Sequence, residues 1–407
     1  MRGPPQFESM RINWFSNAPW AFTGYGNQTK VFVPRLQKLG HEMSITAFYG
    51  HEGAPIVIDN IPIFGKAMHP FGQDVMALHA RTFRADILIS LLDIWVVRAE
   101  YLKDSHWVAW FPIDHEPVTK MTTDISAKAW KRLVFSRFAV NMLREAGQDC
   151  DYIPHGVDTN IFKPLDMSAS RKEVGMPEDA FIVGMVAANK GNPPRKGFFE
   201  NIEAFAQLVK KHKDAILYLH THDGATGAPE TVNLLEYCKF VGLEPGKNVF
   251  FADQYLYALG YPDEAMAKTY SALDTHLLVS KGEGFGIPQL EAQACGVPVI
   301  CGDWTAMSEI FFAGWIVGKD EATKTYSQFG SYQYVPRVGA ITARLEAAYL
   351  RKGTQHLRNQ ARAGALNYDT DLITQDFWKP YLERLQDEIK AEAGKFAPIP
   401  AMQEAQA

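Results

Sequence analysis

The stretch that decides the fold is Ser280-Lys-Gly-Glu-Gly-Phe-Gly-Ile-Pro-Gln-Leu-Glu-Ala-Gln-Ala-Cys-Gly-Val-Pro-Val-Ile300. The apolar run Asp274–Val279 comes directly before it and predicts a buried strand. Pro288 suits the first turn of a helix, which Gly296 ends. The glycines of the intervening loop are Gly282, Gly284 and Gly286. A strand, a glycine-rich loop and a helix in this order present backbone N–H groups at a helix N-terminus, an arrangement that binds phosphate.

Two carboxylates make this more than an ordinary strand-to-helix turn. Glu283 lies in the loop, and Glu291 lies eight residues later, about one turn into the predicted helix. A carboxylate beside a phosphate repels it, so each needs another task. Accepting hydrogen bonds from the vicinal hydroxyls of a ribose or a sugar fits. We expect Glu291 at the ribose and Glu283 at the sugar.

A second candidate phosphate site is Arg195-Lys196-Gly197. It follows the predicted strand Phe181–Ala187 and precedes the predicted helix Phe198–Val209. Fixed cations at this position stabilise the negative charge that grows on a departing nucleoside diphosphate. Lys190 lies in the same loop, and the sequence leaves open which of the three cations holds the diphosphate.

The pattern around these motifs alternates short apolar runs with segments of helical period, which predicts parallel sheets covered by helices. This alternation of predicted strands and helices begins again after a linker near residue 160. The fold class is therefore α/β, with two Rossmann-like doubly wound domains. Ligands of such sheets bind at the carboxyl ends of the strands, so we expect the two domains to face each other across a cleft. The predicted segments are an N-terminal domain 1–160 that holds the acceptor, a C-terminal domain 161–368 that holds the phosphate-bearing donor, helices 369–393 that pack back on the N-terminal domain, and a disordered tail 394–407.

The predicted strands can be named by residue. Those of the first domain are Arg11–Phe15, Glu42–Phe48, Asp86–Leu92, Trp107–Phe111, Leu133–Ser136 and Asp151–Pro154. Those of the second are Phe181–Ala187, Ala215–His220, Asn248–Phe251, Asp274–Val279 and Pro298–Cys301. From Val338 to about Ala393 the pattern is helical.

The spacing of Glu283 and Glu291, followed by Ala-Gln-Ala-Cys-Gly-Val-Pro-Val-Ile, resembles the signature of the retaining glycosyltransferases of family 4, which have the GT-B fold. Three further motifs resemble that family in the same chain order. They are Ser16–Gly26, Ile153–Asp158 and Asn189–Gly197. The family often has an arginine soon after the strand where this chain has Asn189-Lys190.

The resemblance implies a retaining transfer of a hexose such as glucose from a nucleoside-diphosphate sugar, with UDP favoured and no metal or cofactor required. It implies that Glu283, Asp114 and His115 are catalytic, because the family's strand end at Trp110–Pro117 faces the reaction centre. The donor would be held by Arg195, Lys196, Gly284, Phe285, Gly286 and Glu291. An acceptor or phosphate loop would comprise Gly24, Tyr25 and Gly26, although two glycines alone also fit a plain turn.

Several alternatives remain open from the sequence. The sequence does not identify the acceptor. It could be a small molecule, a glycan or a hydroxymethylated base in DNA, as in viral DNA glycosylation. A nucleotide-sugar epimerase would keep the diphosphate site and need no second substrate. A binding protein without turnover is the third reading, and the paired glutamates weigh against it.

Composition supports a folded protein with a reduced, cytoplasmic setting. The chain has 407 residues, 47% hydrophobic and 21% charged, with a net charge of −5, which argues against an obligate nucleic-acid coat. Four cysteines without a C-x-x-C pair are too few for a disulfide framework. Residues 1–9 read as a loose leader, and the longest apolar run, Ile87–Val97, is too short to cross a bilayer. Integral membrane contact is therefore not expected, and the oligomeric state is not readable.

Overall fold

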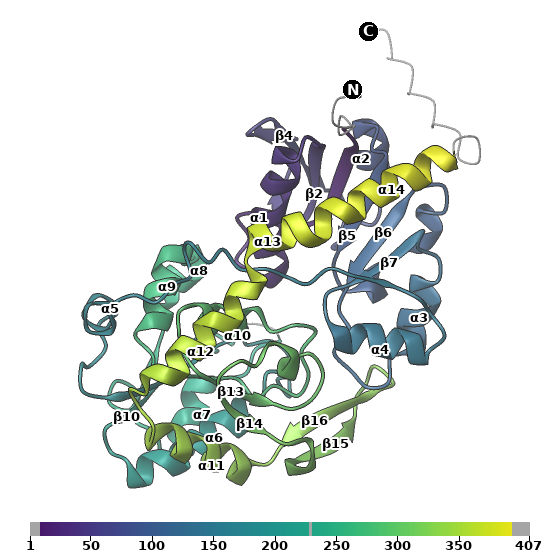
Figure 1. Cartoon of the computed structure of the whole chain (residues 1–407). Coiled ribbons are helices and arrows are strands. Elements are labelled where there is room, and N and C mark those ends of the chain that lie inside the picture. The colour runs from purple at the N-terminus through teal and green to yellow at the C-terminus, as the bar shows by residue number, and fades with distance from the viewer. Residues whose placement is uncertain (1–8, 228–229, 393–407) are drawn as a thin grey trace. The chain divides into compact units, whose positions relative to one another are not determined.

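A computed structural model describes residues 9–227 and 230–392 of the chain (Figure 1). The expected tail 394–407 and nearly all of the expected leader 1–9 lie outside the described residues. The chain divides into two compact units. Unit 1 is drawn from Met1–Pro112, Val118–Gly156 and Thr370–Ala407, and unit 2 from Ile113–Pro117 and Val157–Asp369.

Unit 1 contains an eight-stranded sheet with the order β3-β4-β2-β1-β5-β6-β7-β8. All neighbouring strands run parallel except β3, which pairs antiparallel with β4. The central strands β5 and β6 are buried along their whole length, as continuous apolar runs predict for a sheet covered on both faces. The strands are β1 (Arg11–Asn17), β2 (Glu42–Glu52), β3 (Ile56–Ile58), β4 (Ile61–Lys66), β5 (Ile87–Leu91), β6 (Trp107–Phe111), β7 (Lys131–Val134) and β8 (Asp151–Tyr152).

The helices of unit 1 come from both ends of the chain. Those from the first part are α1 (Gly24–Lys38), α2 (Met76–Phe83), α3 (Lys120–Ser126) and α4 (Arg137–Glu145). The last part adds α13 (Thr370–Ile373), a π-helical turn (Thr374–Trp378) and α14 (Lys379–Ala391), drawn in yellow in Figure 1. Trp378 is fully buried against Trp14 and Trp110, with ring centroids 5.7 and 5.0 Å apart. The end of the described chain therefore completes the core of unit 1.

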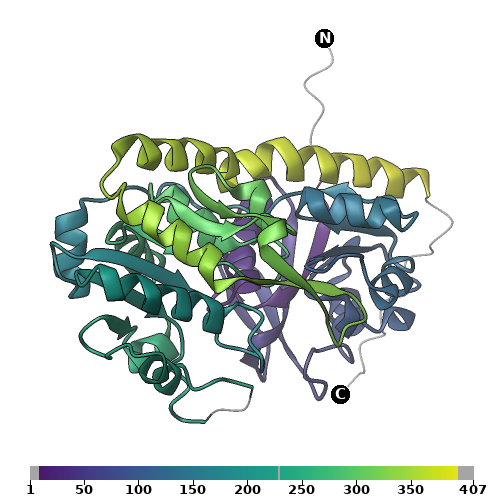
Figure 2. The same cartoon turned by 90° about the horizontal axis from the view of Figure 1, so that it is seen from below.

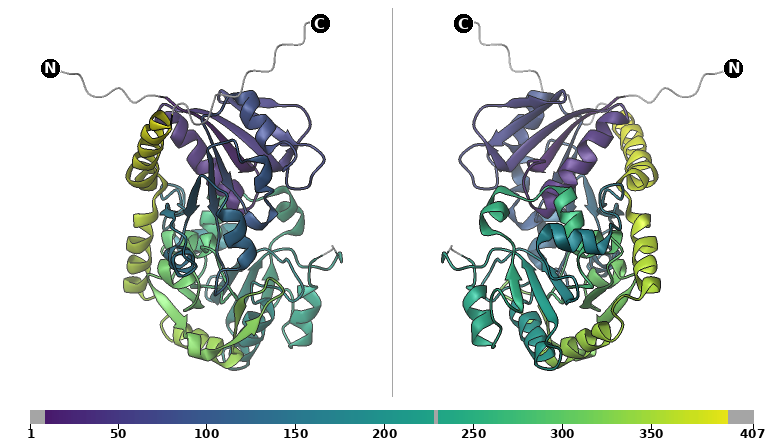
Figure 3. Two further views of the ribbon diagram at one scale, coloured as in Figure 1. Left: turned by 90° about the vertical axis from the view of Figure 1, so that its right-hand side faces the viewer. Right: turned by 90° about the vertical axis from the view of Figure 1, so that its left-hand side faces the viewer.

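Unit 2 contains a six-stranded parallel sheet with the order β11-β10-β9-β12-β13-β14. A separate antiparallel hairpin joins β15 to β16. Helices lie outside the sheets of each unit (Figures 2 and 3). The strands are β9 (Phe181–Val186), β10 (Ala215–His220), β11 (Val249–Phe251), β12 (Thr275–Leu277), β13 (Val299–Gly302), β14 (Gly314–Val317), β15 (Ala322–Tyr326) and β16 (Tyr332–Pro336). The helices are α5 (Met167–Val174), α6 (Phe198–Lys211), α7 (Leu234–Phe240), α8 (Gln254–Leu259), α9 (Asp263–Ser271), α10 (Ile287–Ala294), α11 (Val338–Tyr349) and α12 (Gln355–Ala365).

The observed strands differ from the expected ones in three places. The sequence reading did not anticipate β3 and β4, β14, or the hairpin β15–β16. The chain passes from unit 1 to unit 2 after Gly156, whereas we expected a boundary at residue 160. The segment Ile113–Pro117, expected in the N-terminal domain, groups with unit 2 because it pairs with β16 through Glu116 and Tyr332. No described helix combines the length and apolar character needed to cross a bilayer.

Candidate functional site

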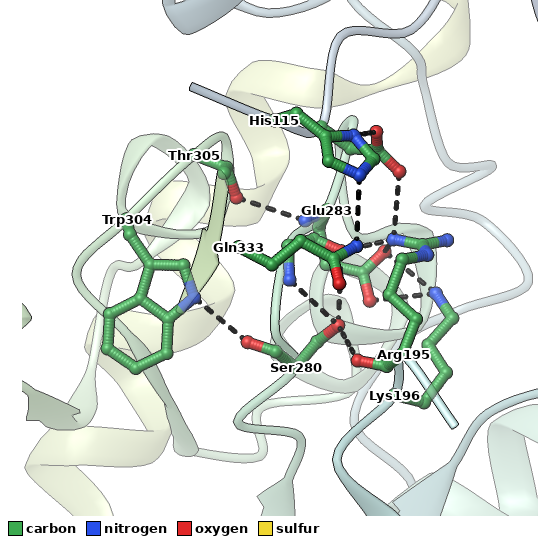
Figure 4. Close-up of polar contacts among 10 residues, drawn as sticks. His115, Arg195, Lys196, Ser280, Glu283, Trp304, Thr305 and Gln333 are labelled. Atoms are coloured by element: carbon green, nitrogen blue, oxygen red, sulfur yellow. Dashed lines mark hydrogen bonds and ion pairs between the residues drawn. The ribbon is translucent and has the colours of Figure 1, made fainter. Parts of the chain in front are cut away.

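Two loops at the carboxyl ends of neighbouring strands of unit 2 are joined by hydrogen bonds (Figure 4). One loop follows β9 and carries Arg195; the other follows β12 and begins at Ser280. The Arg195 carbonyl accepts from the Lys281 N–H at 2.9 Å and from the Ser280 hydroxyl at 3.1 Å. The Arg195 guanidinium donates to the carbonyl of Gly282. Strand register thus brings together two motifs that are about 85 residues apart in sequence.

Four charged side chains meet where these loops join. The Lys196 ammonium binds both carboxylate oxygens of Glu283, at 2.7 and 2.8 Å. The Arg195 guanidinium lies 3.2 Å from Oδ2 of Asp114 and 3.7 Å from Oε2 of Glu283. We call Asp114, Arg195, Lys196 and Glu283 the charged cluster. It contains two cations and two carboxylates, so its formal charge is balanced.

Burial and charge compete within the charged cluster. Burial alone would raise the pKa of Asp114, but Arg195 and His115 outweigh it and lower the pKa to about 2. Burial also opposes ionisation of Glu283, and Lys196 and Arg195 nevertheless hold its pKa below the ordinary value. Burial lowers the pKa of Lys196, and Glu283 only partly offsets this. The two carboxylates are therefore ionised at neutral pH and available as hydrogen-bond acceptors.

The segment that carries Asp114 is fixed by the hairpin β15–β16. Glu116 and Tyr332 exchange backbone hydrogen bonds of 3.3 and 3.2 Å. The Glu116 carboxylate also accepts from Tyr334 at 2.9 Å and from Lys319 at 2.7 Å. On the adjacent residue, Nε2 of His115 lies 3.1 Å from Nε2 of Gln333.

The glycine loop itself leaves no room for side chains at its contact with Asp114. A Cβ on Gly282 would lie 2.3 Å from the carbonyl oxygen of Asp114. Glu283 is held from the other side, because its N–H donates to the Thr305 hydroxyl at 3.0 Å. Gly286, with φ of 108°, caps α10, and Pro288 occupies its first turn as predicted. Gly284, Phe285 and Gly286 thus precede a helix N-terminus, and Phe285 is buried.

Glu291 lies farther along α10. Its carboxylate accepts a hydrogen bond of 2.8 Å from the hydroxyl of Tyr270 on α9. Burial, with a further contribution from Glu291, raises the pKa of Tyr270 well above its ordinary value, so this phenol stays a donor. The structure orients Glu291, and its expected role at a ribose stays a prediction.

Gly24, Tyr25 and Gly26 belong to unit 1 and lie in a helix rather than in a loop, and their role on the acceptor side stays a prediction. Helix α1 begins at Gly24, so these residues form its first turn, capped by the Thr23 hydroxyl, which accepts from the Gly26 N–H at 3.0 Å. A Cβ on Gly26 would lie 2.1 Å from the carbonyl oxygen of Ala21. Close packing against the preceding loop therefore explains this glycine.

The sequence did not identify the residues that hold the charged cluster and the Asp114 segment in place, because they are distant in sequence. Thr305, Gln333 and Tyr334 belong to segments with no recognised motif, and the alternation in Tyr332–Pro336 was the one signal for a strand there. Within residues 9–227 and 230–392, no three or more His, Cys, Asp and Glu side chains gather as a metal site would require. Independence of metal stays a prediction.

Part of this site, including Arg195, Lys196 and Glu283, lies in a segment that matches a known family model. Residues 166–318 match the family model described as Glycosyl transferases group 1. A D-inositol 3-phosphate glycosyltransferase of Geodermatophilus obscurus is 29% identical over 224 residues, which cover 52% of this chain and 46% of the relative. Two other relatives with the same name are matched over 31 and 32% of their own length. The chain thus spans less than half of the length of each of these curated relatives.

Solved structures extend the likeness to nearly the whole chain. Sucrose-phosphate synthase from Thermosynechococcus elongatus superposes with a TM-score of 0.73 at 16% identity, over 93% of this chain and all of that one. Anabaena Alr3699/HepE, solved with UDP-glucose, gives 0.67 at 18% identity, again over 93% and 100%. The chain therefore has the GT-B fold, as predicted, and residues 166–318 are similar to the group 1 glycosyl transferase domain.

Proposed function

We propose that the protein is a retaining glycosyltransferase that moves a hexose, with glucose favoured, from a nucleoside-diphosphate sugar to a hydroxyl acceptor. The observation that carries the proposal is the meeting of Arg195 and Lys196 with Glu283 at a glycine loop that opens a helix. Cations and N–H groups suit a diphosphate, and a buried carboxylate between them suits sugar hydroxyls. The matched group 1 domain supports the same class of reaction.

The charged cluster suggests how binding and chemistry are linked. A diphosphate would draw Arg195 and Lys196 toward its own oxygens and release Glu283 to accept hydrogen bonds from the sugar. When the bond between C1 and the phosphate oxygen breaks, charge grows on the leaving diphosphate, and the cations stabilise it. The new bond joins C1 to the acceptor oxygen, and the acceptor proton passes to the leaving phosphate. Asp114 and His115 would orient the acceptor hydroxyl toward C1.

The remaining roles follow from position. Glu291, oriented by Tyr270, would accept hydrogen bonds from the ribose hydroxyls. Gly284, Phe285 and Gly286 would bring the loop backbone to the diphosphate. UDP-glucose is the favoured donor, with no metal or other cofactor, and Gly24, Tyr25 and Gly26 would lie on the acceptor side.

The test is a screen of nucleotide sugars against the full chain. A true donor raises the melting temperature by mass action, and a donor with a hydroxyl acceptor releases nucleoside diphosphate with retained anomeric configuration. Incubation with donor alone separates the epimerase, which would produce a new sugar epimer. Stabilisation by no nucleotide sugar, or stabilisation unchanged in Glu283→Gln and Lys196→Met, would refute the proposal.

A further inference from the structure

Unit 1 carries a row of exposed aromatic side chains at the carboxyl ends of four adjacent strands. They follow β1, lie in the last part of β2, follow β4 and follow β5, and these strands are neighbours in the order β4-β2-β1-β5. Both tryptophans of the chain that are more than a third exposed are among them. We call the row the aromatic edge; its members are Trp20, Phe22, Tyr49, Phe71 and Trp95.

The aromatic edge is held in place by the core beneath it. The buried ring of Phe48 stacks on Phe15 at 5.5 Å and meets Phe71 at 6.2 Å, and Phe71 meets Trp95 at 6.4 Å. The indole N–H of Trp20 donates to the Gly50 carbonyl at 2.6 Å. These rings are therefore positioned by packing and hydrogen bonding, although their faces reach the surface.

The charge of the same segments is close to neutral. Ala18–Thr23, Tyr49–Gly53, Lys66–Val75 and Leu92–Arg98 contain two basic and three acidic residues. Of the basic ones, Lys66 is bound to Glu52 at 2.7 Å. A surface for phosphorylated or nucleic-acid ligands needs a surplus of cations, which these segments lack.

Two buried amide oxygens add a second, independent observation. Within the part of the chain that the structure describes, Oδ1 of Asn17 and Oε1 of Gln73 are buried and have no hydrogen-bond partner. Asn17 ends β1, and Gln73 lies in the segment after β4. A buried oxygen without a donor destabilises the fold, so donors are expected from elsewhere. Hydroxyl groups are suitable donors.

We infer that the aromatic edge is the acceptor site and that its ligand is a neutral carbohydrate. The inference rests on the proposed function and adds the class of acceptor. Ligands of parallel α/β sheets bind at the carboxyl ends of strands. Aromatic faces pack against the C–H faces of pyranose rings, and the orphaned oxygens accept from sugar hydroxyls. Four strands span about 14 Å, comparable with a short oligosaccharide.

The experiment measures binding of neutral trisaccharides of glucose, mannose, galactose and N-acetylglucosamine to the full chain by calorimetry. At least one binds, and Trp20→Ala and Trp95→Ala weaken it about tenfold or more, whereas Trp95→Phe retains most of the affinity. The matched control is Phe240→Ala, which removes a ring that is 84% exposed in unit 2. Gln73→Leu weakens binding but does not lower the melting temperature, because it removes an unpaired buried oxygen.

Three outcomes overturn the inference. One is that no trisaccharide binds, or that the tryptophan variants bind as the parent does. Another is that D-inositol 3-phosphate binds more tightly than every neutral sugar. The third is that single-stranded dT20 binds more tightly and loses affinity in the same variants. Stabilisation by nucleotide sugars, measured alongside in each variant, shows separately whether the proposed donor site stands, since the aromatic edge lies in the other unit.

Discussion

The charged cluster of unit 2 and the aromatic edge of unit 1 occupy equivalent places on two similar sheets, yet their chemistry is opposite. Both lie at the carboxyl ends of parallel strands. Glu283 of the charged cluster is buried and its other three side chains are half-buried, and the cations and carboxylates are bound to one another. The aromatic edge exposes ring faces and has little net charge.

The difference shows how one sheet architecture is adapted to two kinds of ligand. Charges in the interior are stable only when they are paired, so the charged cluster must hold a balanced set until an anionic ligand exchanges partners with it. Exposed aromatic rings need no such partner. The donor is thus expected to be recognised by exchange of ion pairs, and the acceptor by contact with preformed faces.

The largest effect should follow from removing the central cation. We expect Lys196→Met to lower the transfer rate about 100-fold to 1,000-fold, because one group that stabilises developing charge is lost. Arg195→Met should cost less, and the exposed Lys190→Met least. Lys239→Met, on the surface of α7, is the matched control for loss of a paired lysine. The rate of nucleoside diphosphate release by each variant decides the order. A larger loss of rate in Lys190→Met than in Lys196→Met would show that the charged cluster does not hold the diphosphate.

The next effect concerns the contact between the glycine loop and the Asp114 segment. Gly282→Ala places a Cβ 2.3 Å from a backbone oxygen, so we expect about 1–3 kcal/mol of destabilisation and a lower transfer rate. Gly339→Ala is the control, since a Cβ there meets nothing within 4 Å and lies in α11, where alanine favours the helix. Denaturant unfolding measures both. Equal stability of the two variants would show that the loop and the segment do not need to touch.

Acid titration tests the ion pairing of the charged cluster. The pKa of Asp114 is about 2 in the folded chain against an ordinary value of 3.8, so the unfolded state binds its proton first. Its ionisation therefore contributes about 2 kcal/mol to the free energy of unfolding, fully present above about pH 4 and lost as the pH falls toward 2. Asp114→Asn should remove this dependence, and the exposed Asp387→Asn should keep it. An unchanged slope of stability against pH in Asp114→Asn would contradict the pairing.

The smallest effect is expected at the hairpin. Gln333→Ala removes the partner of His115 at 3.1 Å, a single hydrogen bond that is worth about 0.5–1.5 kcal/mol. We expect a loss of about twofold to tenfold in kcat with little change in donor stabilisation. Gln333→Glu should restore part of the rate, because a carboxylate also bonds to imidazole. A loss of donor stabilisation instead would mean that the hairpin shapes the charged cluster itself.

The sequence predicted the strands with continuous apolar runs and missed those whose residues alternate or are interrupted. Strands such as β5 and β9 are buried on both faces, so their composition identifies them. Strand β4 contains Pro62 and Gly65, which are atypical of strands. Strand β15 is mostly exposed, so no apolar run marks it.

The site was predicted in pieces. Glu283, Arg195 and Lys196 could be found because each lies in a recognisable loop beside a predicted strand. Their meeting with Asp114 was implied by the family resemblance alone, because it depends on the pairing of Glu116 with Tyr332, more than 200 residues apart in sequence. Local patterns report backbone conformation, whereas such long-range pairing is decided by tertiary packing.

The buried position of Trp378 has a consequence for how the protein is made. The ribosome synthesises most of unit 1 first, but the helix that closes its core leaves the ribosome only after all of unit 2. The unit that is begun first is therefore completed last, and Trp14 and Trp110 lack their contacts with Trp378 until the whole of Val157–Asp369 has been synthesised. A chain that ends at Asp369 would contain the whole of unit 2, but its unit 1 would lack Trp378 and should be prone to aggregation and proteolysis.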